Sequence, residues 1–174
     1  MKYSRITVLM AGMAMLAMLG APALALAHTV VAASLQGFEE PPAISTTASG
    51  TFDGEVSSDQ TSIAYVLSYA GLEGDVRQAH IHLGQFSVNG GISIWLCQTT
   101  SNPDPTGLAP TCPQEGTVTG TVTAANVIGP TGQGINAGEF DKIITAMLAG
   151  VTYANVHSTK HPGGEIRGQI AEVP

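Results

Sequence analysis

Two of the five histidines in this 174-residue chain, His80 and His82, stand two positions apart. The segment 76–84 around them, VRQAHIHLG, alternates between polar and apolar residues, which predicts a β-strand with both imidazoles on one face. Residues two apart on one face are separated by about 6.5 to 7 Å at Cα, so both rings can reach a single ion. Imidazole pairs of this kind suit copper or zinc.

Two further histidines lie near the C-terminus. His157 belongs to the segment 151–158, VTYANVHS, which is predicted to be another strand, and His161 follows in the turn TKHPGG. If this strand lies beside the His80 strand, three or four imidazoles converge. One hypothesis is therefore a copper or zinc site made of His80, His82, His157 and His161.

The same residues also fit a polar network without a metal. Glu165 and Arg167 fall on one face of the predicted strand 164–173. Arg167 can pair with a carboxylate, and Glu165 can orient His80 or His82 by accepting a ring N–H. Buried polar side chains are usually hydrogen-bonded, so the scaffold interpretation and the metal interpretation both stay open.

Residues 1–27 have the pattern of a secretory signal peptide. Lys2 and Arg5 precede the apolar run ITVLMAGMAMLAMLGAPALALA, and Ala25 and Ala27 end it at an Ala-x-Ala cleavage site. We expect a secreted or periplasmic protein with one domain, residues 28–174, and no membrane span after cleavage. His28 would then become the N-terminus, where its amino group and imidazole form a possible Cu(II) chelator.

Charge and cysteine content narrow the functional classes. Without residues 1–27 the chain keeps four basic and thirteen acidic residues, a formal charge of −9, and it has no basic cluster. Such a surface repels phosphate backbones, so we expect no nucleic-acid partner. The only cysteines, Cys97 and Cys112, are predicted to form a disulfide in an oxidising compartment, worth about 3 kcal/mol for a loop of this length.

The remaining segments indicate an all-β protein. Thr, Val and Ile recur between Gly-rich turns, and strands are expected at 29–35, 49–56, 61–71, 76–84, 91–97, 116–128, 151–158 and 164–173. Residues 139–149 differ, because their apolar side chains recur at helical spacing and Gly150 follows. We predict an antiparallel, Greek-key-like sandwich or barrel of seven or eight strands, with one short helix capping one end.

Signatures of catalysis are missing from the sequence. It contains no Gly-x-Ser-x-Gly elbow, and its glycine pairs at VNGGIS and HPGGE lack the lysine and helix of a phosphate-binding loop. We therefore expect that the protein is not an enzyme.

Three segments resemble the CHRD domain, a family named for its occurrence in chordin. They are LQGFEEPPAISTTASG, AHIHLGQFSVNGGISIWLC and GEFDKIITAMLAGVTYANVHSTKHPGGEIRGQI, and the resemblance extends from about Leu35 to Ile170. It implies a β-rich extracellular module, which in chordin belongs to a secreted protein that sequesters a growth factor.

The main functional hypothesis is an exported binding or structural module that acts through its surface on a protein or cell-envelope partner, without catalysis. The alternative is a copper- or zinc-binding protein. A remote third hypothesis is a dismutase-like redox activity, because the His-x-His strand is similar to the copper strand of Cu/Zn superoxide dismutases; the histidine that bridges the two metals there has no counterpart here.

Overall fold

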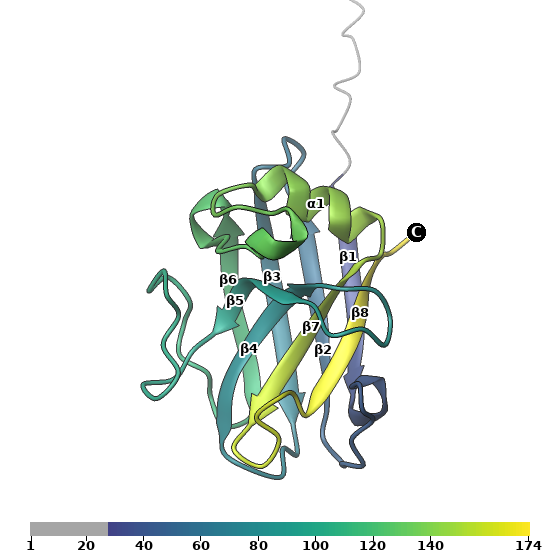
Figure 1. Ribbon diagram of the computed structural model, residues 1–174, viewed down its shortest axis with the longest axis vertical. Coiled ribbons are helices and arrows are strands. Elements are labelled where there is room, and N and C mark those ends of the chain that lie inside the picture. The colour runs from purple at the N-terminus through teal and green to yellow at the C-terminus, as the bar shows by residue number, and fades with distance from the viewer. Residues whose placement is uncertain (1–27) are drawn as a thin grey trace, which may run out of the picture.

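Eight antiparallel strands form one curved sheet in the computed structural model, which describes residues 28–174 (Figure 1). The strands are β1 Thr29–Gln36, β2 Ser49–Val56, β3 Ser62–Ala70, β4 Val76–Leu83, β5 Gly91–Cys97, β6 Gly116–Thr123, β7 Thr152–Ser158 and β8 Ile166–Glu172. Their order in the sheet is β5-β4-β7-β8-β1-β2-β3-β6. The sheet nearly closes into a barrel, because Ile94 of edge strand β5 makes a bridge to Val127, just beyond edge strand β6. The predicted all-β fold is confirmed.

The core lies inside the curved sheet and follows from strict alternation along the strands. In β3, for example, every second residue from Ile63 to Tyr69 is buried while the residues between them face outward. Apolar side chains from all eight strands meet in a single cluster that contains Phe52, Leu67 and Ile81. Removing this apolar surface from water is the main stabilising contribution to the fold.

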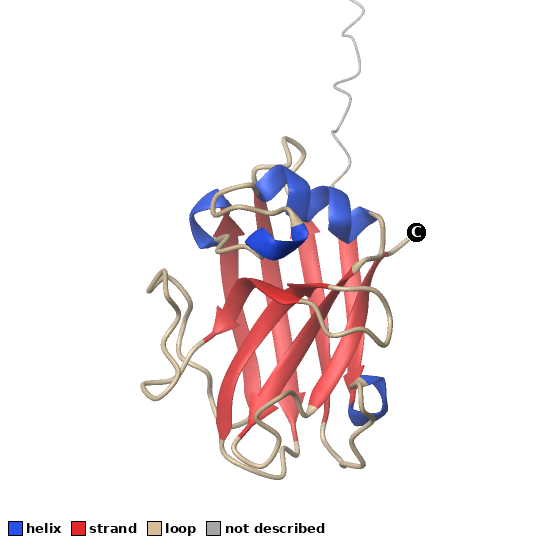
Figure 2. Cartoon of the chain, viewed as in Figure 1, coloured by secondary structure: helices blue, strands red, loops and turns tan. Residues whose placement is uncertain are grey.

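One helix, α1 Phe140–Leu148, lies across one end of the sheet, as Figure 2 shows. Its buried residues are Phe140, Ile143, Ile144 and Met147, the apolar stripe that the sequence predicts. The helix ends where Gly150 takes a left-handed conformation with φ of 69°, which favours glycine. The predicted helix at 139–149 is confirmed to within one residue at each end. Three short 3-10 turns complete the structure: η1 Gly37–Glu39, η2 Ala124–Asn126 and η3 Thr131–Gln133.

Strand β6 is shorter than predicted. The sequence favours a strand through residue 128, whereas β6 ends at Thr123. The chain turns there because Asn126 Oδ1 accepts a hydrogen bond from Thr123 N at 2.9 Å and Thr123 Oγ1 accepts one from Ala125 N at 3.4 Å. These local side-chain bonds replace the next ladder bonds of the strand.

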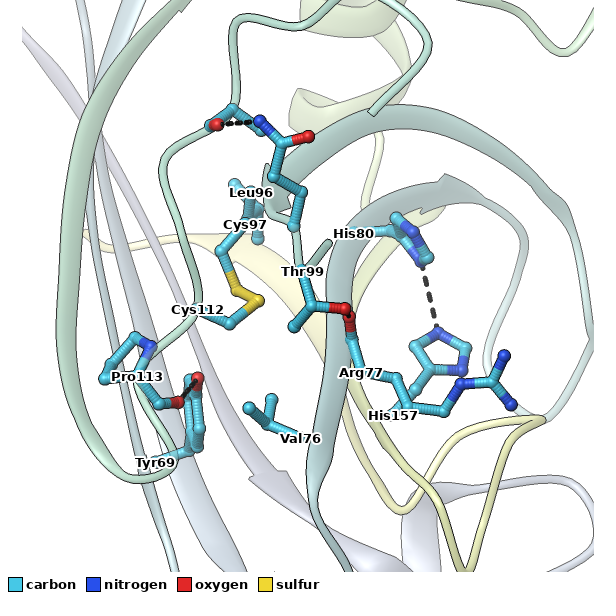
Figure 3. Close-up of a disulfide and its surroundings, with 12 residues drawn as sticks. Tyr69, Val76, Arg77, His80, Leu96, Cys97, Thr99, Cys112, Pro113 and His157 are labelled. Atoms are coloured by element: carbon cyan, nitrogen blue, oxygen red, sulfur yellow. Dashed lines mark hydrogen bonds between the residues drawn. A yellow bond between two sulfur atoms is a disulfide. The ribbon is translucent and has the colours of Figure 1, made fainter. Parts of the chain in front are cut away.

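A disulfide joins Cys97 and Cys112, as the sequence predicted (Figure 3). It closes a loop that begins at the end of β5 and is ordered by one buried carboxylate. Asp104 accepts hydrogen bonds from the backbone N–H groups of Thr106, Leu108 and Ala109 at 2.9–3.1 Å. A disulfide and a buried carboxylate thus hold this segment in place.

Within residues 28–174, no helix combines the length and the apolar character needed to cross a bilayer. The predicted signal peptide, residues 1–27, lies outside the described part of the chain.

Candidate metal centre

Strands β4 and β7 pair side by side and bring three histidines together. Opposite His80 lies Asn155, opposite His82 lies Tyr153, and opposite Gln78 lies His157. Side chains of these positions share the outer face of the sheet, because the core face of β4 carries Ala79 and Ile81. We call His80, His82 and His157 the histidine trio.

The three rings of the trio are close together and buried. Relative exposure is 0% for His80, 7% for His82 and 5% for His157. One nitrogen of each ring lies within 4.8 Å of the corresponding nitrogens of the other two. His80 Nδ1 is 3.1 Å from His157 Nε2, and Figure 3 shows these two rings directed toward one another.

Backbone carbonyls fix which nitrogen carries hydrogen in two of the rings. His82 Nδ1 donates to Gly90 O at 2.9 Å, and His157 Nδ1 donates to Pro162 O at 3.0 Å. A carbonyl only accepts, so each neutral ring is left with a lone pair on Nε2. Bonds of this type from the second ring nitrogen orient histidines that bind metals.

The position of the hydrogen on the third ring, that of His80, follows from the other two rings. Because His157 Nε2 carries a lone pair, the contact with His80 requires that His80 Nδ1 donates, which leaves a lone pair on His80 Nε2. Neither His80 Nε2 nor His82 Nε2 has a hydrogen-bond partner, and both atoms are buried. The side-chain amide of Asn155 also contacts His157 Nε2, at 3.1 Å.

The surroundings keep the trio neutral. Burial lowers the pKa of His82 and that of His157 to about 4. Burial first, and then the nearby rings of His157 and His82, hold the pKa of His80 far below its usual range. At neutral pH all three imidazoles are therefore uncharged, which is the protonation state that binds metal ions.

Two aromatic side chains enclose the trio. Trp95 of β5 meets the ring of His80 edge-on at a centroid distance of 4.3 Å. Tyr153 stacks on His82 with centroids 4.7 Å apart, and its other neighbour is the guanidinium of Arg167, 3.4 Å from the ring centroid. The contact between Trp95 and His80 was not predicted, because the register of the apolar β5 segment relative to β4 is not visible in the sequence.

The side chains of Arg167 and Glu165 have different hydrogen-bond partners. Arg167 is 1% exposed and donates to two backbone carbonyls of the β4–β5 loop, Val88 O at 3.0 Å and Gln85 O at 2.9 Å. No carboxylate pairs with it within residues 28–174. Glu165 accepts from Thr46 Oγ1 and from Glu73 N, both at 2.8 Å, rather than from a histidine.

The other two histidines lie apart from the trio. His161 Nε2 is 3.2 Å from Glu73 Oε2, in the turn between β7 and β8. His28 precedes β1 and pairs with Glu55, its Nδ1 2.6 Å from the carboxylate. The end of β1 that lies beside Arg167 is Gln36, so His28 is at the opposite end of that strand.

One buried carboxylate near the trio was not singled out from the sequence. Glu40 is 6% exposed, and its Oε1 has no hydrogen-bond partner among residues 28–174. Burial raises the pKa of Glu40 to about 7, against the opposing charge of Arg167. The burial of Glu40 was not predictable, because Glu40 stands in a polar, proline-rich segment whose composition is typical of a solvated turn.

A search of the curated proteins and a search of the solved structures gave no match to the chain. The profile of the CHRD domain matches residues 31–170, which include every strand except the first residues of β1 and the last residues of β8. The match spans the trio, the disulfide and the His157 turn together, so these features sit inside one domain of a known kind. The chain belongs to the CHRD domain family.

Proposed function

We propose that this CHRD domain is an exported, non-catalytic metal-binding module, in which His80, His82 and His157 hold a copper ion. One observation carries the proposal: one nitrogen of each ring of the trio lies within 4.8 Å of the others in a buried space, and two ring nitrogens, His80 Nε2 and His82 Nε2, have no hydrogen-bond partner among residues 28–174. Leaving a buried acceptor unsatisfied costs about 1–3 kcal/mol, and a bound cation would remove this cost.

The spacing of the nitrogens supports one shared ion. Two nitrogens bound to the same ion at about 2.0–2.1 Å in tetrahedral geometry are about 3.3 Å apart. His80 Nδ1 and His157 Nε2 are 3.1 Å apart. For this pair of nitrogens to hold one ion, the hydrogen on His80 Nδ1 must move to Nε2, which frees the Nδ1 lone pair.

Charge favours copper in its singly charged state over zinc. The trio contributes three neutral rings and no carboxylate. The free energy of moving an ion into a dry interior rises with the square of its charge, so a divalent ion costs about four times as much as a monovalent one. Imidazole suits copper, and a soft Cu(I) ion accepts low coordination numbers.

Burial of the trio supports binding rather than turnover. His80 has no exposed surface, Trp95 packs against it edge-on, and Tyr153 stacks on the ring of His82. A substrate therefore has no visible approach to a bound ion. The partner that gives or receives copper would be a protein or another component outside the cell membrane.

The decisive experiment is Cu(I) titration of the 28–174 protein under anaerobic conditions, in competition with a chromophoric Cu(I) chelator. We expect one equivalent to bind, with zinc binding more weakly by calorimetry. His157→Gln and His82→Gln should each weaken Cu(I) binding by roughly tenfold or more.

His161→Gln and His28→Gln are the matched controls, because each removes one imidazole that lies outside the trio. Both should leave the Cu(I) affinity unchanged. Equal losses for all four variants, or no binding by the unaltered protein, would refute the assignment of the trio.

A further inference from the structure

A second group of ligand-type side chains lies outside the trio, at the end of the sheet opposite α1. The β3–β4 loop and the β7–β8 turn lie next to each other there (Figure 1). Thr159 N donates to Asp75 O at 2.8 Å, and Asp75 N donates to Thr159 Oγ1 at 3.0 Å. These bonds hold the two segments together.

Glu73, His161 and Glu165 meet at this junction. One ligand atom of each residue lies within 4.8 Å of the corresponding atoms of the other two. Glu73 and His161 keep side-chain exposures of 31% and 19%, so the cluster opens to solvent on one side. Glu165 forms its closed inner side, with no exposed surface.

Only one of the two oxygens of the Glu165 carboxylate accepts hydrogen bonds. Its Oε1 is fixed by Thr46 Oγ1 and Glu73 N, whereas its Oε2 is buried without a hydrogen-bond partner. No Lys, Arg or His nitrogen in residues 28–174 forms an ion pair with it. An unpaired buried carboxylate is strongly unfavourable in free energy. The position of Glu165 therefore indicates that a bound cation neutralises it in the working protein.

Within residues 28–174, the ammonium group of Lys160 is the one Lys or Arg group that forms an ion pair at this junction. Lys160 Nζ lies 2.6 Å from Glu73 Oε2, the oxygen that His161 also contacts. Lys160 is 56% exposed and reaches the outer carboxylate alone. The ammonium therefore neutralises Glu73 and leaves the charge on Glu165 uncompensated.

We infer that Glu73, His161 and Glu165 form a second site, specific for a divalent cation, in which the ion displaces the ammonium of Lys160 from Glu73. Two carboxylates and one imidazole make a harder ligand set than the trio, and they suit Mn²⁺ or Zn²⁺ rather than Cu(I). The backbone bond from Glu73 N and the hydroxyl bond from Thr46 hold Glu165 in place, as supporting groups do around metal ligands.

Mn²⁺ is the probe for this site, because it prefers carboxylate oxygens and three neutral imidazoles bind it poorly. We expect one equivalent to bind to the metal-free 28–174 protein, measured as loss of the electron paramagnetic resonance signal of free Mn²⁺. Glu73→Gln and His161→Gln should each weaken Mn²⁺ binding by roughly tenfold or more. Lys160→Ala should strengthen it several-fold, since the competing ammonium is gone.

Glu115→Gln is the matched control, because it removes one exposed carboxylate outside the cluster and should not change Mn²⁺ affinity. The gain expected for Lys160→Ala cannot arise from unfolding. Unchanged affinity in that variant, or equal loss in Glu73→Gln and Glu115→Gln, would overturn the inference. His157→Gln should leave Mn²⁺ binding unchanged, so the experiments can refute this site and the trio independently of each other.

Discussion

Acidification should unfold this domain through its buried histidines. The pKa of His82 and that of His157 fall from 6.5 to about 4 on folding, so the unfolded chain binds more protons than the folded one between these values. Their contribution is complete above pH 6.5 and is lost as the pH falls toward 4. At about 1.4 kcal/mol for each pKa unit, two shifts of about 2.5 units amount to roughly 7 kcal/mol.

Glu40 has the opposite effect on how the unfolding free energy depends on pH. Its pKa rises from 4.5 to about 7 on folding, so its contribution is complete below pH 4.5 and is lost as the pH rises to 7. Through Glu40, acidification from pH 7 to 4 therefore raises the unfolding free energy by roughly 3 kcal/mol. The net fall in unfolding free energy is about 3–4 kcal/mol, and His80 adds to it with a shift of the same sign.

Urea unfolding of the metal-free protein at several values between pH 7.5 and 4 measures this fall. Trp95 is the only tryptophan and lies against His80, so its fluorescence reports the site directly. Glu40→Gln removes the opposing contribution and should make the fall in unfolding free energy on acidification steeper. A flat unfolding free energy over this range, or a rise on acidification, would show that the trio does not stay neutral in the folded protein.

Three other predictions concern stability away from the trio. Replacing both Cys97 and Cys112 by Ala should lower the unfolding free energy by about 3 kcal/mol in thermal melts, because the loop of the unfolded chain is no longer closed. Asp104→Ala should cost about 1–3 kcal/mol in urea titrations, since three backbone N–H groups lose their acceptor; Asp104→Asn should recover part of it. Met147→Ala should cost about 2–5 kcal/mol by the same assay through the cavity it leaves under α1, whereas Leu148→Ala, on the exposed side, should cost far less.

Much of the fold was predictable because period and position are local properties. The alternation of residues 76–84 and the helical spacing of residues 139–149 each identified an element to within a residue or two. The end of β6 was not predictable from period, since Val127 and Ile128 extend the strand-like composition past Thr123 while the bonds between Thr123, Ala125 and Asn126 turn the chain. Side-chain capping of this kind competes with the ladder and leaves little trace in a hydrophobic pattern.

The site was less predictable, because it depends on contacts between distant parts of the chain. That His80 faces His157 follows from the pairing of β4 with β7, which are 77 residues apart at this contact. The carbonyls of Gly90 and Pro162 orient two rings, yet a backbone acceptor has no signature in a sequence. His161 fell outside the trio because the turn after β7 directs it toward Glu73.

The contrast between Arg167 and the trio weighs against a purely structural role for the histidines. Arg167 is equally buried, and both of its terminal nitrogens donate to loop carbonyls while its flat face lies on Tyr153. A side chain that serves only to hold the β4–β5 loop is expected to be satisfied in this way. His80 and His82 instead each leave one ring nitrogen buried and unpaired, and their neutrality makes the fold sensitive to acid. A scaffold gains nothing from that arrangement, whereas a module that binds a cation needs ring nitrogens whose lone pairs no protein group has taken, as is the case for His80 Nε2 and His82 Nε2.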